Sequence, residues 1–457
     1  MYALLKTTIE EITKSEPVDY GQYVINPKLA SDLKRKLLFR HIQSFDWEQG
    51  GLLSPIKFLD RDSVEYCLVQ ASCNDQTEAR MARLTLSNSF ALLDPVWGGI
   101  YQYSTRSDWE HPHFEKTMAN QAGYLRIYIL AYSLWQEQRF LLAANSIYKY
   151  MKRFLTGPDG AFYCAQSDRI NGYDSYVYFS SGNQQRIKAG IPEIDKKIYA
   201  RENGWAIEAL ATLYEFTGDK SALHRAQRAA NWIIKHRILP GGGYRHDKYG
   251  EDGPYLGDSL AMGRAFLQLF RVTGKQKWLM HACDTTDFIY TKFKRRGSGF
   301  NRALDLGEIS RPAPQIDENI SLTRFANLLF HYTGKSRFRE ISKHGLRYLV
   351  TPQIVNARQE EAGILLADNE LSEEPKRIVI IGDKSDSQTR LLHQTALQSF
   401  GWYKKIDCYR KITSLPKEMK HMDARIGKSP AAIVTNEYHC SRPAYDAATL
   451  NRLIKDM

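Results

Sequence analysis

The chain has 457 residues, of which 43% are hydrophobic and 12% aromatic, and its formal net charge is +12. The hydrophobic content suffices for a large core, but no apolar run approaches the roughly 18 residues of a membrane helix, so we expect no membrane span. The basic residues are scattered and accompany no nucleic-acid-binding motif, which favours a solubilising surface over specific nucleic-acid binding.

The start of the chain and its cysteines both indicate a cytoplasmic protein. Residues 1–6 turn polar too early for the apolar region of a signal peptide. The cysteines form neither a C-x-x-C pair nor a zinc-type Cys/His spacing, so we expect them to be reduced and mostly buried. They are Cys67, Cys73, Cys164, Cys283, Cys408 and Cys440.

Helical periodicity runs through most of the chain before residue 352. After an N-terminal extension over 1–26, apolar residues recur at helical spacing in eleven segments, one short of six hairpins. The predicted helices span about 27–45, 61–73, 76–93, 114–136, 138–156, 197–217, 219–237, 256–273, 275–293, 316–334 and 336–351.

Three of these hairpins share a Thr-Gly link, at Gly218, Gly274 and Gly334. Glycine readily adopts the left-handed conformation that ends a helix, and so short a link makes the next helix an antiparallel neighbour. One helix pair cannot bury both of its faces, so the pairs must stack. We therefore predict an all-α (α/α)6 toroid over 27–352, with inner and outer helices alternating. An open solenoid is the alternative architecture.

Gly-rich turns followed by long polar and aromatic loops mark the other end of each pair. Equivalent positions of a ring point to the same end, so these loops should converge on one pocket, and function commonly resides on such loops. The loops span 98–116, 160–169, 241–258 and 297–321.

After residue 352 the helical repeat is lost. Residues 377–383 read as a buried strand and turn, 385–400 as a helix and 431–435 as a second strand. The first turn lacks the glycine pattern or the lysine of a nucleotide-binding loop. The sequence therefore predicts a small α/β segment over 353–457, and no cofactor.

Several motifs resemble the spermatogenesis-associated protein 20 type family. The longest runs from Gly98 to Met118, where G-G-I-Y-Q-Y-S-T, Trp109 and P-H-F-E-K-T-M resemble the family's G-G-F-x-R-Y-S-x-D-x-x-W-x-V-P-H-F-E-K-M block. The resemblance covers roughly residues 45–457. Shorter matches are found at 160–166, Asp195, Lys197, Asn203, Gly204, 256–258, 314–321 and 440–443.

This resemblance implies an (α/α)6 toroid similar to those of N-acylglucosamine 2-epimerase and the six-hairpin glycosidases. In the family a thioredoxin-like domain precedes the toroid, whereas here only about 40 residues stand in its place. The family's D-A-D run reads Ser167-Asp168-Arg169, and Glu202 replaces the Trp of W-N-G. These departures weaken a redox role, which would depend on Cys440 alone, and they suggest altered chemistry in the cleft.

Four ionisable side chains on the long loops are candidate catalytic residues. His113 and Glu115 stand at a predicted helix start, and histidine titrates near neutral pH, which suits a general acid or base. Asp168 and Asp258 follow later Gly-rich turns, and a carboxylate pair is what glycoside hydrolysis needs. The structural alternatives are packing of His113 and helix capping by Glu115 and Asp258.

Aromatic residues on the same loops are candidates for stacking on a sugar face, although each alone would also suit the core. His111 is expected at the surface, and the His-x-His formed with His113 lacks a third ligand, so no metal is predicted. The candidate substrate-binding residues are Tyr101, Tyr103, Trp109, Tyr163, Tyr244 and, in the segment that resembles the family's P-S-G-N-S, Asn319.

The sequence thus predicts a carbohydrate-active or carbohydrate-binding toroid. A sugar isomerase or epimerase, or a hydrolase, would act on a small-molecule sugar with His113 as acid or base. The alternative is a non-catalytic scaffold that descends from such an enzyme and binds a protein partner, which the missing carboxylates and the missing thioredoxin-like domain favour.

Overall fold

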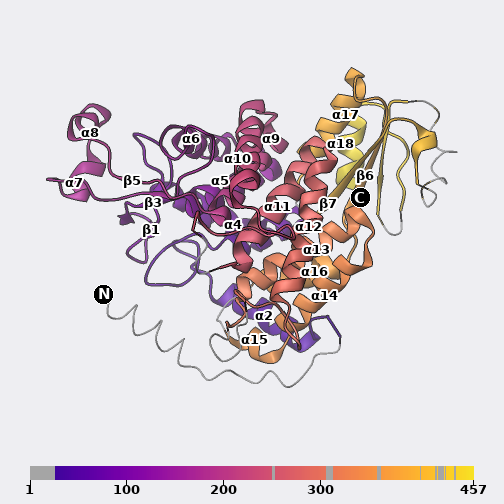
Figure 1. Cartoon of the computed structure of the whole chain (residues 1–457), viewed down its shortest axis with the longest axis horizontal. Coiled ribbons are helices and arrows are strands. Elements are labelled where there is room, and N and C mark those ends of the chain that lie inside the picture. Colours follow the sequence, from indigo (N-terminus) through magenta and orange to yellow (C-terminus); the bar gives the residue numbers. More distant parts are fainter. Residues whose placement is uncertain are drawn as a thin grey trace.

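The computed structural model describes residues 26–249, 253–304, 312–357, 362–401, 403–416, 419, 427, 429–436 and 439–456. Of the predicted N-terminal extension, residues 1–25 lie outside this part of the chain. The described residues are mostly helical (Figure 1). None of their helices is both long enough and apolar enough to cross a membrane.

Six helices form a closed inner ring. Each packs against the next, and the last packs against the first, so the predicted (α/α)6 toroid is confirmed and the open solenoid is not what forms. In ring order the inner helices are α3 (Arg61–Ser72), α5 (Met118–Trp135), α9 (Ala200–Thr217), α11 (Leu256–Thr273), α13 (Ile316–Thr333) and α16 (Ala362–Ser372).

An outer helix covers each inner one. The last hairpin joins distant parts of the chain, because α2 near its start packs on α16 near residue 370. The outer helices are α4 (Gln76–Asn88), α6 (Gln138–Phe154), α10 (Lys220–Arg237), α12 (Gln276–Phe293), α14 (Ser336–Leu349) and α2 (Ser31–Gln43). A 3-10 turn, η1 (Ser89–Leu92), extends α4.

Helix α16 is the twelfth ring helix, which the sequence analysis assigned to the C-terminal segment. It follows the short helix α15 (Pro352–Ala357), and nearly all of its residues are buried. A helix buried on most sides lacks the one-sided apolar stripe by which surface helices are recognised. The ring therefore extends to Ser372, beyond the predicted boundary at residue 352.

The Thr-Gly links behave as predicted. Gly218, Gly274 and Gly334 cap α9, α11 and α13 with φ of 75°, 65° and 68°, in the left-handed region. Each link runs from an inner helix to its outer partner. The C-terminal ends of the inner helices therefore share one end of the ring, and their N-terminal ends share the other, where the long loops lie.

The Gly-rich turns also repeat. Each closes an isolated antiparallel bridge between the end of an outer helix, or the 3-10 turn after it, and the apolar residue that follows the glycines. The bridges join Phe45 to Leu52, Leu93 to Ile100, Thr156 to Phe162, Ile238 to Tyr244 and Lys294 to Phe300.

Two small antiparallel sheets sit beside the N-terminal end of α5. The first is β1 (Tyr103–Ser104) with β2 (Pro112–His113), and the second is β3 (Lys116–Thr117), β4 (Ala165–Gln166) and β5 (Ile194–Asp195). Helix α5 thus begins at Met118 and not at residue 114, which puts His113 in a strand. Two short helices, α7 (Ser175–Ser180) and α8 (Asn183–Ala189), project beyond these sheets (Figure 1).

The C-terminal segment is the predicted small α/β unit. Its central strand β6 pairs parallel with β7 and antiparallel with β8. The segment packs on the short-link end of the ring, where Lys404 Nζ lies 3.1 Å from Glu215 Oε1 of α9. Its elements are β6 (Lys376–Ile381), α17 (Ser387–Gln398), β7 (Lys404–Tyr409), the 3-10 turn η2 (Ile412–Ser414), β8 (Ala431–Thr435) and α18 (Ala447–Asp456).

The cysteine expectation holds only in part. None of the six cysteines, all of which are among the described residues, forms a disulfide. Cys67 and Cys283 are buried, but Cys73 is exposed at the end of α3, and the other three are half-buried.

Candidate functional site

A cavity of about 1460 Å³ lies inside the ring. Its walls are the N-terminal halves of the inner helices and the loops that precede them, and Trp205 and Tyr255 add aromatic surface. The cavity lining also carries many charged side chains, both acidic and basic, and such a mixture of hydrogen-bond acceptors and donors suits a polyhydroxylated ligand better than an apolar one. The charged lining residues are Asp60, Arg61, Asp62, Glu65, Arg126, Arg201, Glu208, Asp258, Arg264, Arg302, Asp317, Glu318 and Arg324.

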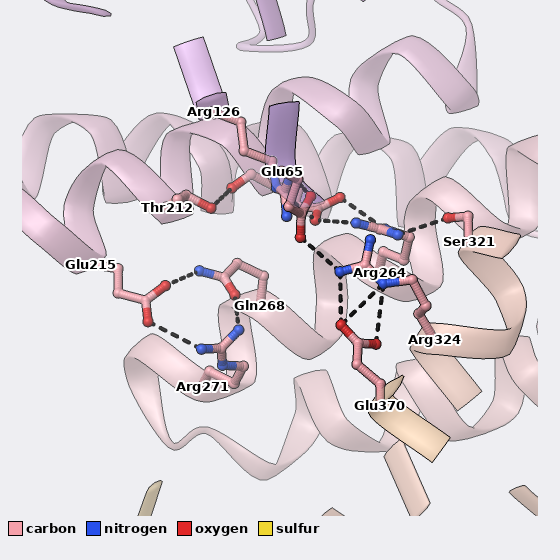
Figure 2. Close-up of polar contacts among 11 residues, drawn as sticks. Glu65, Arg126, Thr212, Glu215, Arg264, Gln268, Arg271, Ser321, Arg324 and Glu370 are labelled. Atoms are coloured by element: carbon pink, nitrogen blue, oxygen red, sulfur yellow. Dashed lines mark hydrogen bonds and ion pairs between the residues drawn. The ribbon is translucent and has the colours of Figure 1, made fainter. Parts of the chain in front are cut away.

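Each inner helix contributes a charged side chain that is at most 12% exposed to a set that we term the charge belt: Glu65, Arg126, Glu208, Arg264, Arg324 and Glu370. Figure 2 labels all of them except Glu208. Three ion pairs show how closely its members meet. Glu65 lies 2.7 Å from both Arg126 and Arg324, and Glu208 lies 2.8 Å from Arg264. Burial favours the neutral carboxyl of Glu65, but Arg126 and Arg324 overcome this and hold its pKa well below the usual range. The belt therefore joins neighbouring inner helices and, through Glu65 and Arg324, also joins α3 to α13, which α16 separates in the ring.

His246 and Asp258 form a hydrogen-bonded pair in the cavity wall, nearer the N-terminal ends of the helices. His246 Nδ1 lies 2.9 Å from Asp258 Oδ1, and the backbone N–H of Arg201 donates to the same oxygen at 2.9 Å. This bond to Asp258 raises the pKa of His246 despite partial burial. With Nδ1 donating to the carboxylate, Nε2 is the nitrogen left for a ligand.

The surroundings fix the orientation of the His246 ring. Tyr199 stacks on it with ring centroids 4.2 Å apart, and Tyr255 meets it edge-on at 6.0 Å. Asp258 is 1% exposed and sits in the first turn of α11, where the helix dipole stabilises a carboxylate. The imidazole is thus oriented by a buried, charged partner, as general bases commonly are.

Glu318, in the first turn of α13, is a second ionisable group beside this pair. Burial raises its pKa to about 7, with Arg201 opposing the shift and Asp258 adding to it. Its Oε2 is buried and has no hydrogen-bond partner among the described residues. A Cβ at Gly257 would lie 2.6 Å from Glu318 Oε1, so the glycine makes room for the carboxyl. Glu318 therefore holds a proton near neutral pH, and it lines the same cavity as His246.

The raised pKa of Glu318 predicts a pH-dependent stability difference. Because the folded-state value of about 7 lies above the ordinary 4.5, the folded chain holds this proton more tightly than the unfolded chain does. The contribution of Glu318 to the free energy of unfolding is thus fully present below about pH 4.5 and lost as the pH rises through 7. Glu318→Gln should therefore gain stability relative to wild type between about pH 5 and pH 8.

Urea unfolding at the two pH values measures this effect. Glu340→Gln is the matched control, because Glu340 is exposed on α14, the outer partner of α13. The control should show no gain between the two pH values. A Glu318→Gln variant whose stability relative to wild type is the same at both would contradict the assignment.

Of the four predicted catalytic residues, Asp258 alone lines the cavity. His113, Glu115 and Asp168 instead gather on the small sheets. His113 Nε2 lies 3.8 Å from Asp168 Oδ2, its ring stacks on Tyr103 at 5.2 Å, and its buried Nδ1 has no hydrogen-bond partner among the described residues. Burial raises the pKa of Glu115, and the charge of His113 partly offsets this shift. These residues do converge, but on a cluster separate from the cavity lining.

Three of the predicted stacking residues belong to the core. Tyr101, Trp109 and Tyr244 are at most 3% exposed, because large aromatic side chains gain most from burial. Trp109 packs over Gly51 and donates its indole N–H to the Gln49 carbonyl. Tyr103 and Tyr163 are half-buried, and neither lines the cavity. The expected aromatic cleft from these loops is therefore not formed.

Asn319, predicted to bind substrate, instead holds the backbone of a Gly-rich turn and does not line the cavity. It is fully buried and bonds both backbone groups of Phe300, at 2.8 and 3.0 Å. Asn203 does the same for Phe162, and Gln121 for Ile100. An amide side chain near the start of an inner helix thus satisfies the backbone after each of these Gly-rich turns.

The charge belt and His246 were missed at the sequence level. The belt did leave a signal: Arg126, Glu208, Arg264 and Arg324 each precede the left-handed residue that caps their helix by the same number of residues. Charged residues in that register of apolar inner helices point to a polar ring interior. His246 left no comparable signal, because only the folded chain brings Asp258 and Tyr199 to it.

Sequence comparison finds relatives for part of the chain, although no family model matches it. Over 169 residues it is 28% identical to an uncharacterised protein of Caenorhabditis elegans, covering 33% of this chain and 23% of that one. Over 147 residues it is 27% identical to spermatogenesis-associated protein 20 of Rattus norvegicus and of Homo sapiens, covering 31% of this chain and 19% of each relative. About a third of the chain is thus similar in sequence to spermatogenesis-associated protein 20. The match spans about a fifth of the length of these curated relatives.

Solved structures confirm the toroid. Cellobiose 2-epimerase from Bacillus thermoamylovorans superimposes with a TM-score of 0.55 at 13% identity, covering 70% of this chain and 86% of that one. A sugar epimerase from a ruminal bacterium gives 0.54 at 15% identity with the same coverage. At such identities the likeness concerns the fold.

Proposed function

We propose that the protein is a sugar epimerase or isomerase that moves a proton at a carbon beside a carbonyl group. The observation that carries this proposal is the His246–Asp258 pair in the wall of the ring cavity, with the carboxyl of Glu318 close by. Such chemistry needs one base and one acid around the reacting carbon. The names of the two solved structures, both sugar epimerases, agree with it.

In the proposed reaction His246 is the base. Its Nε2 takes the proton from the carbon beside the carbonyl of an open-chain sugar, the C–H bond breaks, and the electron pair passes into an enediolate. Asp258 stabilises the imidazolium that results. A proton then returns from Glu318 to the opposite face of the same carbon, which gives the epimer, and exchange with water resets His246 and Glu318. In the isomerisation the His246 imidazolium instead returns its proton to the neighbouring carbon, while the hydroxyl proton passes between the two enediolate oxygens.

Glu318 supplies the acid in the proposed reaction, and Arg201 and Arg302 supply positive charge. The carboxyl of Glu318 can donate a proton near neutral pH, since its pKa is about 7. Arg201 and Arg302 also line the cavity, and both lower the pKa of Glu318 through their charge. Their charges are therefore available to the developing enediolate oxygen. Each step leaves atoms and charges balanced and requires no redox partner.

The proposal predicts hydrogen exchange with solvent. In deuterated buffer, the C2 proton of a sugar with a free reducing end should be replaced by deuterium in the presence of the protein, as followed by proton NMR on a panel of mono- and disaccharides. Saturation-transfer NMR identifies which sugars of the panel bind. If sugars bind but none of them exchanges its C2 proton or is converted to an epimer or isomer, the enzymatic proposal is overturned. That result would favour the non-catalytic binding ring.

A further inference from the structure

Three side chains that commonly ligate metals meet outside the cavity, between α2, α3 and α4. His41 Nε2 lies 3.0 Å from Glu78 Oε2 and 3.6 Å from Cys67 Sγ, and the three ligand atoms are all within 4.8 Å of one another. The residues are 2%, 5% and 3% exposed. None of the three lines the ring cavity.

The geometry differs from that of a catalytic Cys–His–acid relay. A relay places the thiol at one imidazole nitrogen and the acid at the other. Here the carboxylate and the sulfur both face Nε2 of His41, and a single N–H cannot serve both well. Ligands that converge on one point are typical of residues that share a cation.

The Cys67–His41 distance fits tetrahedral zinc, whereas the 3.0 Å between His41 Nε2 and Glu78 Oε2 is a hydrogen-bond distance, so the Glu78 carboxylate would move back by a few tenths of an ångström to bind the ion. Zinc bonds of about 2.3 Å to sulfur and about 2.0–2.1 Å to nitrogen, at tetrahedral angles, place the two ligand atoms about 3.6 Å apart. The Cys67 to His41 distance is 3.6 Å. Three protein ligands leave a fourth position for water.

Charge balance supports a divalent ion. A Cys67 thiolate and a Glu78 carboxylate together offset the charge of one divalent cation, and a neutral cluster can be buried where an anionic one cannot.

We propose that His41, Cys67 and Glu78 bind a divalent transition-metal ion, best matched by zinc. The ion would tie α2, the outer helix of the last hairpin, to the α3–α4 hairpin beside it, and so stabilise ring closure. No local sequence motif predicts this site, because its ligands come from three separate helices. The inference is independent of the proposed sugar chemistry.

Cobalt titration of the chelator-treated 457-residue chain tests the proposal. One equivalent of Co²⁺ should produce a sulfur-to-cobalt charge-transfer band and visible bands of tetrahedral intensity, and Zn²⁺ should displace it and raise the Tm. Cys67→Ser should abolish the charge-transfer band, and His41→Asn should weaken binding about tenfold or more.

Cys283→Ser is the matched control, since Cys283 is a buried cysteine on α12. It should retain the wild-type spectrum. Failure of wild-type protein to bind one equivalent, or a charge-transfer band that persists in Cys67→Ser, would overturn the proposal. The wild-type titration keeps the test decisive even if a variant does not fold.

Discussion

Replacing His246 by alanine is expected to lower kcat by about 10²–10⁴-fold on a sugar identified by deuterium exchange, with the fold retained. The imidazole supplies the only proposed base, and its Nδ1 is committed to Asp258 at 2.9 Å. Asp258→Asn should also lower kcat, because an amide can hold the ring in the wrong tautomer and cannot stabilise the imidazolium. Steady-state kinetics and circular dichroism of the purified variants measure the two effects.

His111→Ala is the matched control for this experiment. His111 also pairs with a carboxylate, Asp108, at 2.8 Å, but its side chain is 41% exposed and lies outside the cavity lining. The control should retain wild-type kcat. Full activity in His246→Ala would exclude His246 as the base, and a large loss in His113→Ala instead would return that role to the residue that the sequence analysis favoured.

Replacing Arg324 by methionine is expected to destabilise the fold by about 3–5 kcal/mol. Arg324 is 2% exposed and bonds two buried carboxylates, at 2.7 Å to Glu65 and 2.8 Å to Glu370. Its loss leaves Glu370 without this counter-charge and Glu65 with Arg126 alone, since methionine fills the volume but carries no charge. Urea unfolding followed by circular dichroism gives the difference in free energy.

Arg337→Met is the control for Arg324→Met. Arg337 pairs with Asp287 at 3.0 Å, but the two side chains are 47% and 40% exposed, so this substitution should cost no more than about 1 kcal/mol. Adding Glu370→Gln to Arg324→Met should recover part of the loss by removing the unpaired charge. Equal costs for the two arginines would show that the belt contributes no more than a surface ion pair.

The hairpins could be predicted from the sequence because their determinants are local. Gly218, Gly274 and Gly334 end helices through a backbone conformation that needs no distant partner. The apolar spacing between these glycines then sets the helix lengths. A closed ring follows from this pattern only when a sixth hairpin exists, and α16 showed no such pattern because it is buried on nearly all sides.

The site could be predicted only in part. Asp258 was predicted because it follows a Gly-rich turn at a helix start, and it does line the cavity, whereas its catalytic role stays a prediction. His113 follows an equivalent turn, but it pairs with Tyr103 across β1 and β2, and on this small sheet it is not among the residues that line the cavity. Local sequence does not distinguish these two outcomes.

The sequence by itself thus determined the repeat, the helix ends and the end of the ring at which the long loops lie, since each depends on backbone conformation within a few residues. Only the tertiary structure decided which side chains face the axis. His246 meets Asp258, and His41 meets Cys67 and Glu78, across separate elements of the chain. Such contacts depend on how helices distant in sequence pack around the ring, and no local pattern encodes them.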